Sequence, residues 1–185
     1  LQKSFGFSKT PIREALAQLK AEGLVVSEVH KGFRVFKMDE KELSEFCEYR
    51  LALESHALKN AYKNDRLELV RVLKDFIKDF KESIKENDFN KYNLIDTKFH
   101  KSFFILSSNR YLTKNYENIN GIIETIRTHT GPVIVDNYKL IDSINGHISI
   151  HKHIKAKNLN LALEELDKHI NSWHDDRIIK SLLIS

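Results

Sequence analysis

The feature that most restricts the fold of this 185-residue chain is a helical spacing of apolar residues, sustained from residue 39 to residue 183. Apolar side chains recur every three or four positions, and short polar breaks interrupt the pattern. The spacing predicts six helices, over residues 39–63, 66–86, 88–107, 110–132, 137–157 and 160–183. Six helices joined by short connections predict an all-helical bundle.

The first 37 residues follow a different pattern. Ser8 is a suitable N-cap, Pro11 lies in the first turn, and Gly23 closes the helix PIREALAQLKAE. The following segment, LVVSEVHKGFRVFKM, is rich in β-branched and aromatic residues and turns at HKG, which predicts a β-hairpin. We therefore expect a mostly α-helical protein, with a winged helix-turn-helix domain over residues 1–37 and a helical domain over residues 38–185.

The chain opens inside this motif, so we expect the winged helix to be incomplete, with its first helix missing. Residues 1–37 carry seven Lys and Arg against three acidic residues, whereas the remainder is balanced, so the formal net charge of +4 lies entirely in this segment. Such an excess favours contact with phosphates. No apolar run is long enough to span a membrane, and the single cysteine, Cys47, fits a reducing cytoplasm.

The second helix of a helix-turn-helix presents its N-terminal residues to base edges in the major groove. Four candidates occupy that position: Ser8, Lys9, Thr10 and Arg13. Arg13 lies one turn into the helix, from which a guanidinium can make two hydrogen bonds to guanine. The wing adds His30, Lys31 and Gly32, and the glycine would let the tip approach DNA closely. The alternative is an amphipathic helix packed on a hairpin, with a solvated basic face and no DNA partner.

Histidines are abundant, with nine in the chain and most of them in its second half. Asp96 and His100 are four residues apart and so share one face of a helix. Further histidines lie on the last two predicted helices: His147, His151, His153 and His169. An acid and several imidazoles on inward faces could converge on one metal ion. Hydrogen-bonded structural histidines are the alternative.

The segment SKTPIREALAQLKAEGLV resembles the signature S-R-T-P-V-R-E-A-L-x-x-L-x-x-E-G-L-V of the GntR family of bacterial regulators. It differs at Lys9, where the family usually has arginine, and the wing HKGFRVFKM also resembles that family's short wing. The resemblance implies a transcriptional regulator that binds a double-stranded DNA operator as a homodimer.

The remainder, residues 39–183, resembles the helical FCD domain of the FadR-type branch of that family. The segment DTKFHKSFFILSSN matches its D-x-x-x-H pattern with the later asparagine, and His147 and His169 stand 22 positions apart, as in its second pattern. The resemblance implies a divalent metal, Zn²⁺, Ni²⁺ or Mn²⁺, with these ligands: Asp96, His100, His147 and His169. His151, one turn after His147, is an alternative ligand or a residue beside the effector.

Arg50, in RLALE, matches an arginine that in this family often faces an effector cavity. A guanidinium beside a metal suits a small organic acid. The alternative for Arg50 is an ion pair with Glu54 on the same helix, and both are retained. Arg127 and His129 are weaker candidates for the same cavity. Three functions remain open: an effector-controlled regulator, a metal-dependent enzyme of a helical bundle, and a regulator whose metal is purely structural.

Overall fold

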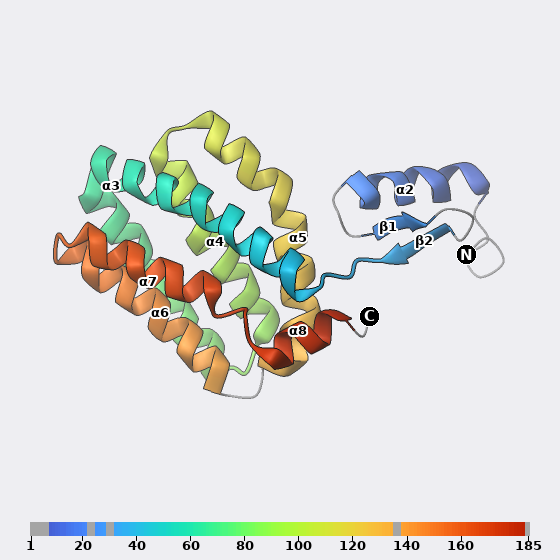
Figure 1. Cartoon of the computed structure of the whole chain (residues 1–185). Helices are drawn as coiled ribbons and strands as arrows, with labels where there is room; N and C mark the ends of the chain where they lie inside the picture. The colour runs from blue at the N-terminus through green and yellow to red at the C-terminus, as the bar shows by residue number, and fades with distance from the viewer. Residues whose placement is uncertain (1–7, 22–24, 29–31, 135–137, 184–185) are drawn as a thin grey trace.

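The computed structural model describes residues 8–21, 25–28, 32–134 and 138–183, and the wing residues His30 and Lys31 lie outside these ranges. Figure 1 shows a small N-terminal head, joined by an extended segment to a larger bundle of helices. The head contains α2 (Lys9–Ala21), β1 (Val25–Glu28) and β2 (Gly32–Val35). The bundle contains α3 (Glu40–Lys85), α4 (Phe89–Ser107), α5 (Arg110–Ile134), α6 (Tyr138–Lys155), α7 (Leu159–Asn171) and α8 (Asp176–Leu183).

The head has the helix and hairpin that the sequence predicts. Strands β1 and β2 pair antiparallel, with Val25 opposite Val35 and with Glu28 opposite Gly32. Gly32 has φ +94°, which a residue with a side chain rarely adopts. Lys20 on α2 donates to the Ser27 hydroxyl of β1 at 3.0 Å, which ties the helix to the hairpin. The mostly α-helical fold with a winged N-terminal head is therefore confirmed for the described part of the chain.

Helix α3 is long because two predicted helices join at a kink. It begins with a capping box, in which Asp39 accepts from the backbone of Glu42 at 2.8 Å and the Glu42 carboxylate accepts from Asp39 N at 2.9 Å. Asp65 has φ −154° and ψ 89°, outside the helical region, at the position where the sequence predicts a break. Its carboxylate accepts from Glu68 N at 2.9 Å and so caps the second arm.

One predicted helix end agrees with the structure to within two residues, and one predicted helix is wrong. Helix α5 continues past Gly131 and Pro132 to Ile134. A Cβ at Gly131 would lie 2.7 Å from Phe89 Cε1, so this glycine allows close packing on α4 instead of ending the helix. The predicted helix over 160–183 is instead two helices, because α7 ends at Asn171 and α8 begins at Asp176. None of the helices in the described ranges is long and apolar enough to span a membrane.

The bundle buries an aromatic core together with several polar groups. Helix α3 packs along α4, while α6 and α7 form a neighbouring pair and α8 lies on α5 (Figure 1). The largest buried apolar side chains include Phe80, Phe99, Phe103, Phe104 and Tyr116. Several charged or polar side chains are buried among them, including Arg50, Glu54, Asp96, His100, Arg127 and His147. Because unpaired buried charge is costly, these residues must satisfy one another or a ligand.

The segment between the head and the bundle is held at alternate residues. Phe36 and Met38 are buried in the apolar core, and Lys37 between them is exposed. The Lys37 ammonium donates to the backbone carbonyl of Leu183, in the last turn of α8, at 3.3 Å. The connection to the head is therefore fixed to the bundle on both of its faces.

Candidate metal centre and effector cavity

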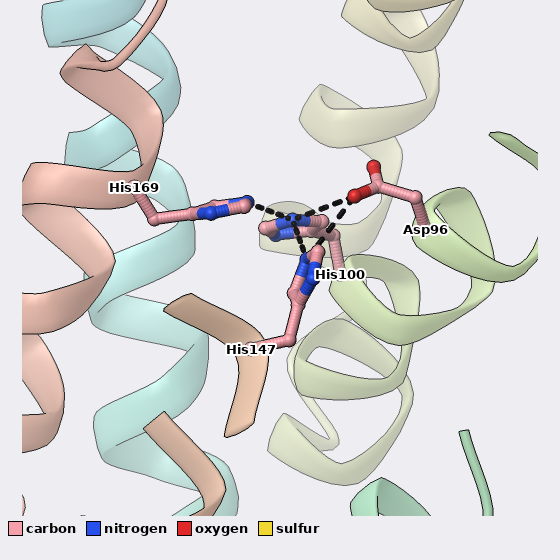
Figure 2. A group of neighbouring side chains, drawn as sticks. All are labelled: Asp96, His100, His147 and His169. Carbon is pink, nitrogen blue, oxygen red and sulfur yellow. Dashed lines mark hydrogen bonds and ion pairs between the residues drawn. The ribbon is translucent and has the colours of Figure 1, made fainter. Parts of the chain in front are cut away.

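Four side chains from three helices converge inside the bundle (Figure 2). Asp96 and His100 project from α4, His147 from α6 and His169 from α7. One potential ligand atom of each lies within 4.8 Å of all the others. His100 Nε2 is 3.2 Å from His169 Nε2 and 3.3 Å from His147 Nε2, and His147 Nε2 is 3.1 Å from Asp96 Oδ1. The helical spacing thus brings together the four residues predicted from the sequence.

The ring of His100 is oriented by a second carboxylate. His100 Nδ1 lies 2.5 Å from Glu54 Oε2, and both side chains are fully buried. Burial would raise the pKa of Glu54, but Arg50 and His100 outweigh it and lower that pKa to about 2. Because Glu54 is a carboxylate, the proton that His100 shares with it lies on Nδ1, so Nε2 is the nitrogen that faces the cluster.

His147 is held in place by aromatic rings. Phe80 stacks on it with ring centroids 4.6 Å apart, and Phe99 meets it edge-on at 4.5 Å. Its Nδ1 is buried and has no hydrogen-bond partner among the described residues. Without a metal, an Nε2–H that donates to Asp96 satisfies this geometry; a metal bound at Nε2 would replace that proton and leave the ring proton on Nδ1.

The carboxylate of Asp96 is shared between the cluster and Arg127. Arg127 Nη2 donates to Asp96 Oδ2, while Arg127 Nη1 donates to Thr97 Oγ1 at 2.6 Å and to Glu124 at 3.2 Å. Burial would raise the pKa of Asp96, but Arg127, His100 and the bond with His147 hold it well below its usual range. Asp96 is therefore charged at neutral pH, with one oxygen directed to the imidazoles.

The chemistry of this donor set fits a divalent metal. Burial lowers the pKa of His147 to about 4 and the pKa of His169 well below its usual range, although Asp96 opposes both shifts. These imidazoles are therefore neutral at neutral pH, as a metal requires. Three nitrogens and one carboxylate oxygen suit Zn²⁺, Ni²⁺ or Mn²⁺, and the set does not select one of them.

A cavity of about 540 Å³ adjoins the cluster. Asp96 and His169 form part of its wall, together with the guanidinium groups of Arg50 and Arg127. Trp173 adds an aromatic surface, and the Arg50 guanidinium lies 4.7 Å from its ring centroid. Polar side chains from α4, α6 and α7 complete the wall, among them Asn93, Ser143, Ser149 and Glu165. The cavity therefore combines two arginines and a lysine, Lys168, with two of the four potential metal ligands and with groups able to bind hydroxyls.

Residues 45–172 match the FCD domain family, and residues 1–35 match the bacterial regulatory proteins of the gntR family. The chain belongs to the GntR family of transcriptional regulators and carries an FCD domain.

Relatives of this GntR-family chain span nearly all of it. The HTH-type transcriptional regulator YdhC of Bacillus subtilis is 27% identical, over 99% of this chain and 80% of YdhC. The gluconate operon transcriptional repressor of the same organism is 26% identical, over 92% of this chain and 71% of its own. The matched families and relatives are DNA-binding regulators, not enzymes, which excludes the metal-dependent enzyme considered above.

Solved structures share the fold. E. coli McbR/YncC superposes with a TM-score of 0.72 at 18% identity, covering 92% of this chain and 80% of its own. The metal-free FCD domain of TM0439 has a TM-score of 0.62 at 27% identity, covering 78% of this chain and 96% of its own. The first supports the arrangement of head and bundle together, and the second supports the FCD bundle.

The effector residues predicted for this FCD domain divide into two groups. Arg50 and Arg127 line the cavity, and Arg50 also forms the ion pair with Glu54, at 2.6 Å, that was its alternative. His151 and His129 are absent from the cavity wall. His151 lies one turn after His147 on α6 and interacts with the backbone of Val70 on α3, so it lies outside this cavity, and its contact with an effector stays a prediction.

The predicted DNA-contact residues of the GntR head lie where the sequence places them along the chain. Ser8 directly precedes α2, and Lys9, Thr10 and Arg13 occupy its first turns, all exposed to solvent. Gly32 begins β2 at the start of the second wing strand. Their contact with DNA stays a prediction.

Sequence reasoning missed two residues that shape the centre. Glu54 was considered only as a partner for Arg50, and its bond to His100 joins residues 46 positions apart. Gly146 lies on α6 where a Cβ would come within 2.9 Å of His169 Nδ1. Its position directly before a candidate ligand was the only signal in the sequence, and a glycine inside a helix is otherwise unfavourable.

Gly146→Ala is expected to weaken metal binding about tenfold, because the new methyl group displaces the His169 ring from the cluster, at an overpacking cost of about 1–3 kcal/mol. The measurement is a zinc titration in competition with a chromophoric chelator. Gly131→Ala is the matched control, since its Cβ meets Phe89, 2.7 Å away, and that ring lies outside the cluster. Equal zinc affinities in Gly146→Ala and Gly131→Ala would contradict this role of Gly146.

The metal-free protein is expected to lose stability as the pH falls. The pKa of His147 is about 4 in the folded protein and 6.5 ordinarily, so between these values the unfolded chain binds a proton that the folded state excludes. Its contribution to stability is complete above the ordinary pKa and is lost below it, by about 2 kcal/mol at pH 5. Urea unfolding of chelator-treated protein at pH 7 and pH 5 measures the loss. A His147→Gln variant should show a smaller difference between the two pH values; an equal difference would contradict the assignment.

Proposed function

We propose that this GntR-family chain is a metal-containing transcriptional regulator whose affinity for its operator is controlled by a small organic acid. Residues 1–37 would read double-stranded DNA, and residues 38–185 would bind the metal and the effector. The protein would act as a homodimer in the cytoplasm. The single observation that carries the proposal is a cluster of three imidazoles and one carboxylate that adjoins, through Asp96 and His169, a cavity that two arginines also line.

The proposed metal ligands are Asp96 Oδ1 and the Nε2 atoms of His100, His147 and His169. When bound, the metal supplies a Lewis acid that can take an oxygen of the effector in a position left open by the protein. Two neighbouring residues would hold the ligands of such a site in place. Glu54 holds the ring of His100, and Arg127 holds Asp96, as partners of metal ligands do in other proteins.

The proposed effector is a carboxylate because of the cations at the cavity wall. Arg50 Nη2 is buried and has no hydrogen-bond partner among the described residues. A buried guanidinium nitrogen without an acceptor is costly, and a carboxylate would satisfy both its charge and its geometry. The serines, Asn93 and Glu165 at the wall would suit hydroxyl groups on the same molecule. The repressor of the gluconate operon is a relative, so gluconate is the first acid to test.

Control of DNA binding would follow from population shift. A homodimer presents two reading heads, and their separation must match the spacing of two half-sites in the operator. An effector that binds one arrangement of the bundle better than another changes the populations of both. Repression and activation are both compatible with this mechanism.

The proposal is tested by preparing the protein in metal-loaded and chelator-stripped forms and screening small organic acids, gluconate first, by thermal shift. Elemental analysis first measures the bound metal. We expect about one metal per chain, and stabilisation by an acid that is lost in the stripped form while the stripped protein stays folded. A stripped protein that unfolds would favour a purely structural metal. Absence of bound metal after zinc loading, or no stabilising acid in either form, would contradict the proposal.

A further inference from the structure

Glu54 is a buried carboxylate that joins two functional groups. Its Oε1 accepts from Arg50 Nε at 2.6 Å, and its Oε2 lies 2.5 Å from His100 Nδ1. The side chain is fully buried, so solvent does not compete for either oxygen. Each oxygen therefore has its own donor, one from α3 and one from α4.

The contact with His100 selects one form of that ring. A carboxylate accepts hydrogen bonds and does not donate, so the proton that His100 shares with Glu54 is held on Nδ1. The other nitrogen, Nε2, is then the one available to a metal, and it lies within 3.3 Å of the Nε2 atoms of both His147 and His169. The opposite tautomer would direct a proton into the cluster and prevent this nitrogen from binding a metal.

Arg50 connects Glu54 with the cavity, because it binds Glu54 and also lines the cavity wall. Arg50 uses Nε for Glu54 and leaves Nη2 buried and without a partner among the described residues, while the side chain lines the cavity wall. Its guanidinium lies over the Trp173 ring, 4.7 Å from the centroid, which fixes its plane. The same guanidinium group therefore binds Glu54 and belongs to a residue of the cavity wall.

We propose that Glu54 is a positioning residue, which holds His100 in its metal-binding tautomer and, through Arg50, couples occupancy of the cavity by a carboxylate to metal affinity. The inference rests on the proposed function, since it assigns a means of communication between that metal and that effector. A carboxylate bound at Nη2 weakens the electrostatic attraction between Arg50 and Glu54, because it shares the positive charge of Arg50. Glu54 then holds the His100 proton more strongly, which makes Nε2 a better ligand, so metal and carboxylate tighten each other's binding.

Glu54→Gln separates this role from simple packing, because it preserves shape but leaves one acceptor oxygen where two are used. If the amide oxygen accepts from Arg50, the amide NH₂ faces His100 Nδ1 and stabilises the tautomer with its proton on Nε2. We expect zinc affinity, measured in competition with a chelator, to fall about 10–100-fold. Glu68→Gln is the matched control, because Glu68 pairs with Arg71 at 2.5 Å on the same helix but at the surface.

A second readout does not depend on metal. Long-range ¹H–¹⁵N spectra of the metal-free protein report which imidazole nitrogen carries the proton. We expect Nδ1 of His100 to be protonated in the wild type and in Glu68→Gln, and Nε2 to be protonated in Glu54→Gln. Wild-type zinc affinity in Glu54→Gln, or an unchanged His100 tautomer, would overturn the inference while leaving the proposed function intact.

The coupling is tested with gluconate as the carboxylate probe, after correction for zinc bound by gluconate alone. In the wild type, gluconate should raise zinc affinity by the same factor by which zinc raises gluconate affinity. Arg50→Lys keeps Glu54 and His100 but removes the guanidinium group, so whatever its zinc affinity we expect that factor to fall toward one, which keeps the test decisive if Glu54→Gln fails to fold. An undiminished factor in Arg50→Lys would overturn the coupling. Failure of the wild type to bind zinc at all would contradict the proposed function itself.

Discussion

His147→Ala is expected to leave the purified protein without stoichiometric metal, whereas His151→Ala is expected to retain it. His147 Nε2 lies within 3.3 Å of both Asp96 Oδ1 and His100 Nε2. Loss of a ligand should cost more than loss of a residue that only orients one, so we expect zinc affinity to fall by at least about 100-fold. Elemental analysis after dialysis, followed by a chelator competition, measures the effect.

His151 is a close control because it is also an α6 histidine, four residues further along the same helix, and lies outside the cluster. Circular dichroism of both variants checks that the helices remain, since His147 also fills the space between Phe80 and Phe99. Metal retained in His147→Ala and lost in His151→Ala would move the ligand by one turn of α6. Metal lost in both would show that the site depends on the whole helix and not on one imidazole.

Arg13→Ala is expected to remove most of the sequence preference of the DNA-binding head. Arg13 is exposed in the first turns of α2, from which its guanidinium can reach a guanine edge in the major groove. One such contact contributes about 1–3 kcal/mol of discrimination, which corresponds to roughly 5- to 150-fold in affinity for the preferred site. Selection from a randomised duplex pool first identifies the operator, and anisotropy titrations then compare operator with unrelated duplex.

Arg110→Ala is the charge-matched control for this experiment. Arg110 is an exposed arginine at the start of α5 in the helical domain, and its loss removes the same charge from the chain. We expect Arg110→Ala to keep both the affinity and the preference of the wild type. If Arg13→Ala also kept the preference and lost only affinity for every duplex alike, Arg13 would contact phosphate and not a base.

The elements of the bundle were predictable because apolar spacing reports local structure. The break at Asp65 was visible as a polar interruption, and it is the kink of α3. The break between α7 and α8 was not predictable, because it depends on tertiary contacts. At Gly131 the helix continues, and the absence of a side chain leaves room for the Phe89 ring. Between α7 and α8 the apolar spacing of the sequence is not interrupted, although the helix ends there. Sequence signals for helix ends are weaker than the packing that decides them.

The four clustered residues could be predicted from two spacings, four residues for Asp96 and His100 and 22 for His147 and His169, because each spacing is characteristic of a family. Glu54 could not. Its separation of four from Arg50 is typical of an ordinary ion pair on a helix surface, and nothing local indicates that the pair is buried. Its contact with His100 exists only once α3 packs on α4. Residues that orient a ligand carry weaker local patterns than the ligands themselves.

Helix α8 is short, but it contacts both the cavity and the segment that leads to the DNA-binding head. Ile178 near its start lines the cavity, and the carbonyl of Leu183 at its end accepts from Lys37, two residues beyond the last strand of the wing. A helix of eight residues, about 12 Å long, moves as one rod. Whatever displaces Ile178 therefore also displaces the acceptor of Lys37. Phe36 and Met38 are buried in the core of the bundle. Such a movement would therefore rotate the DNA-binding head relative to the bundle and would not detach it.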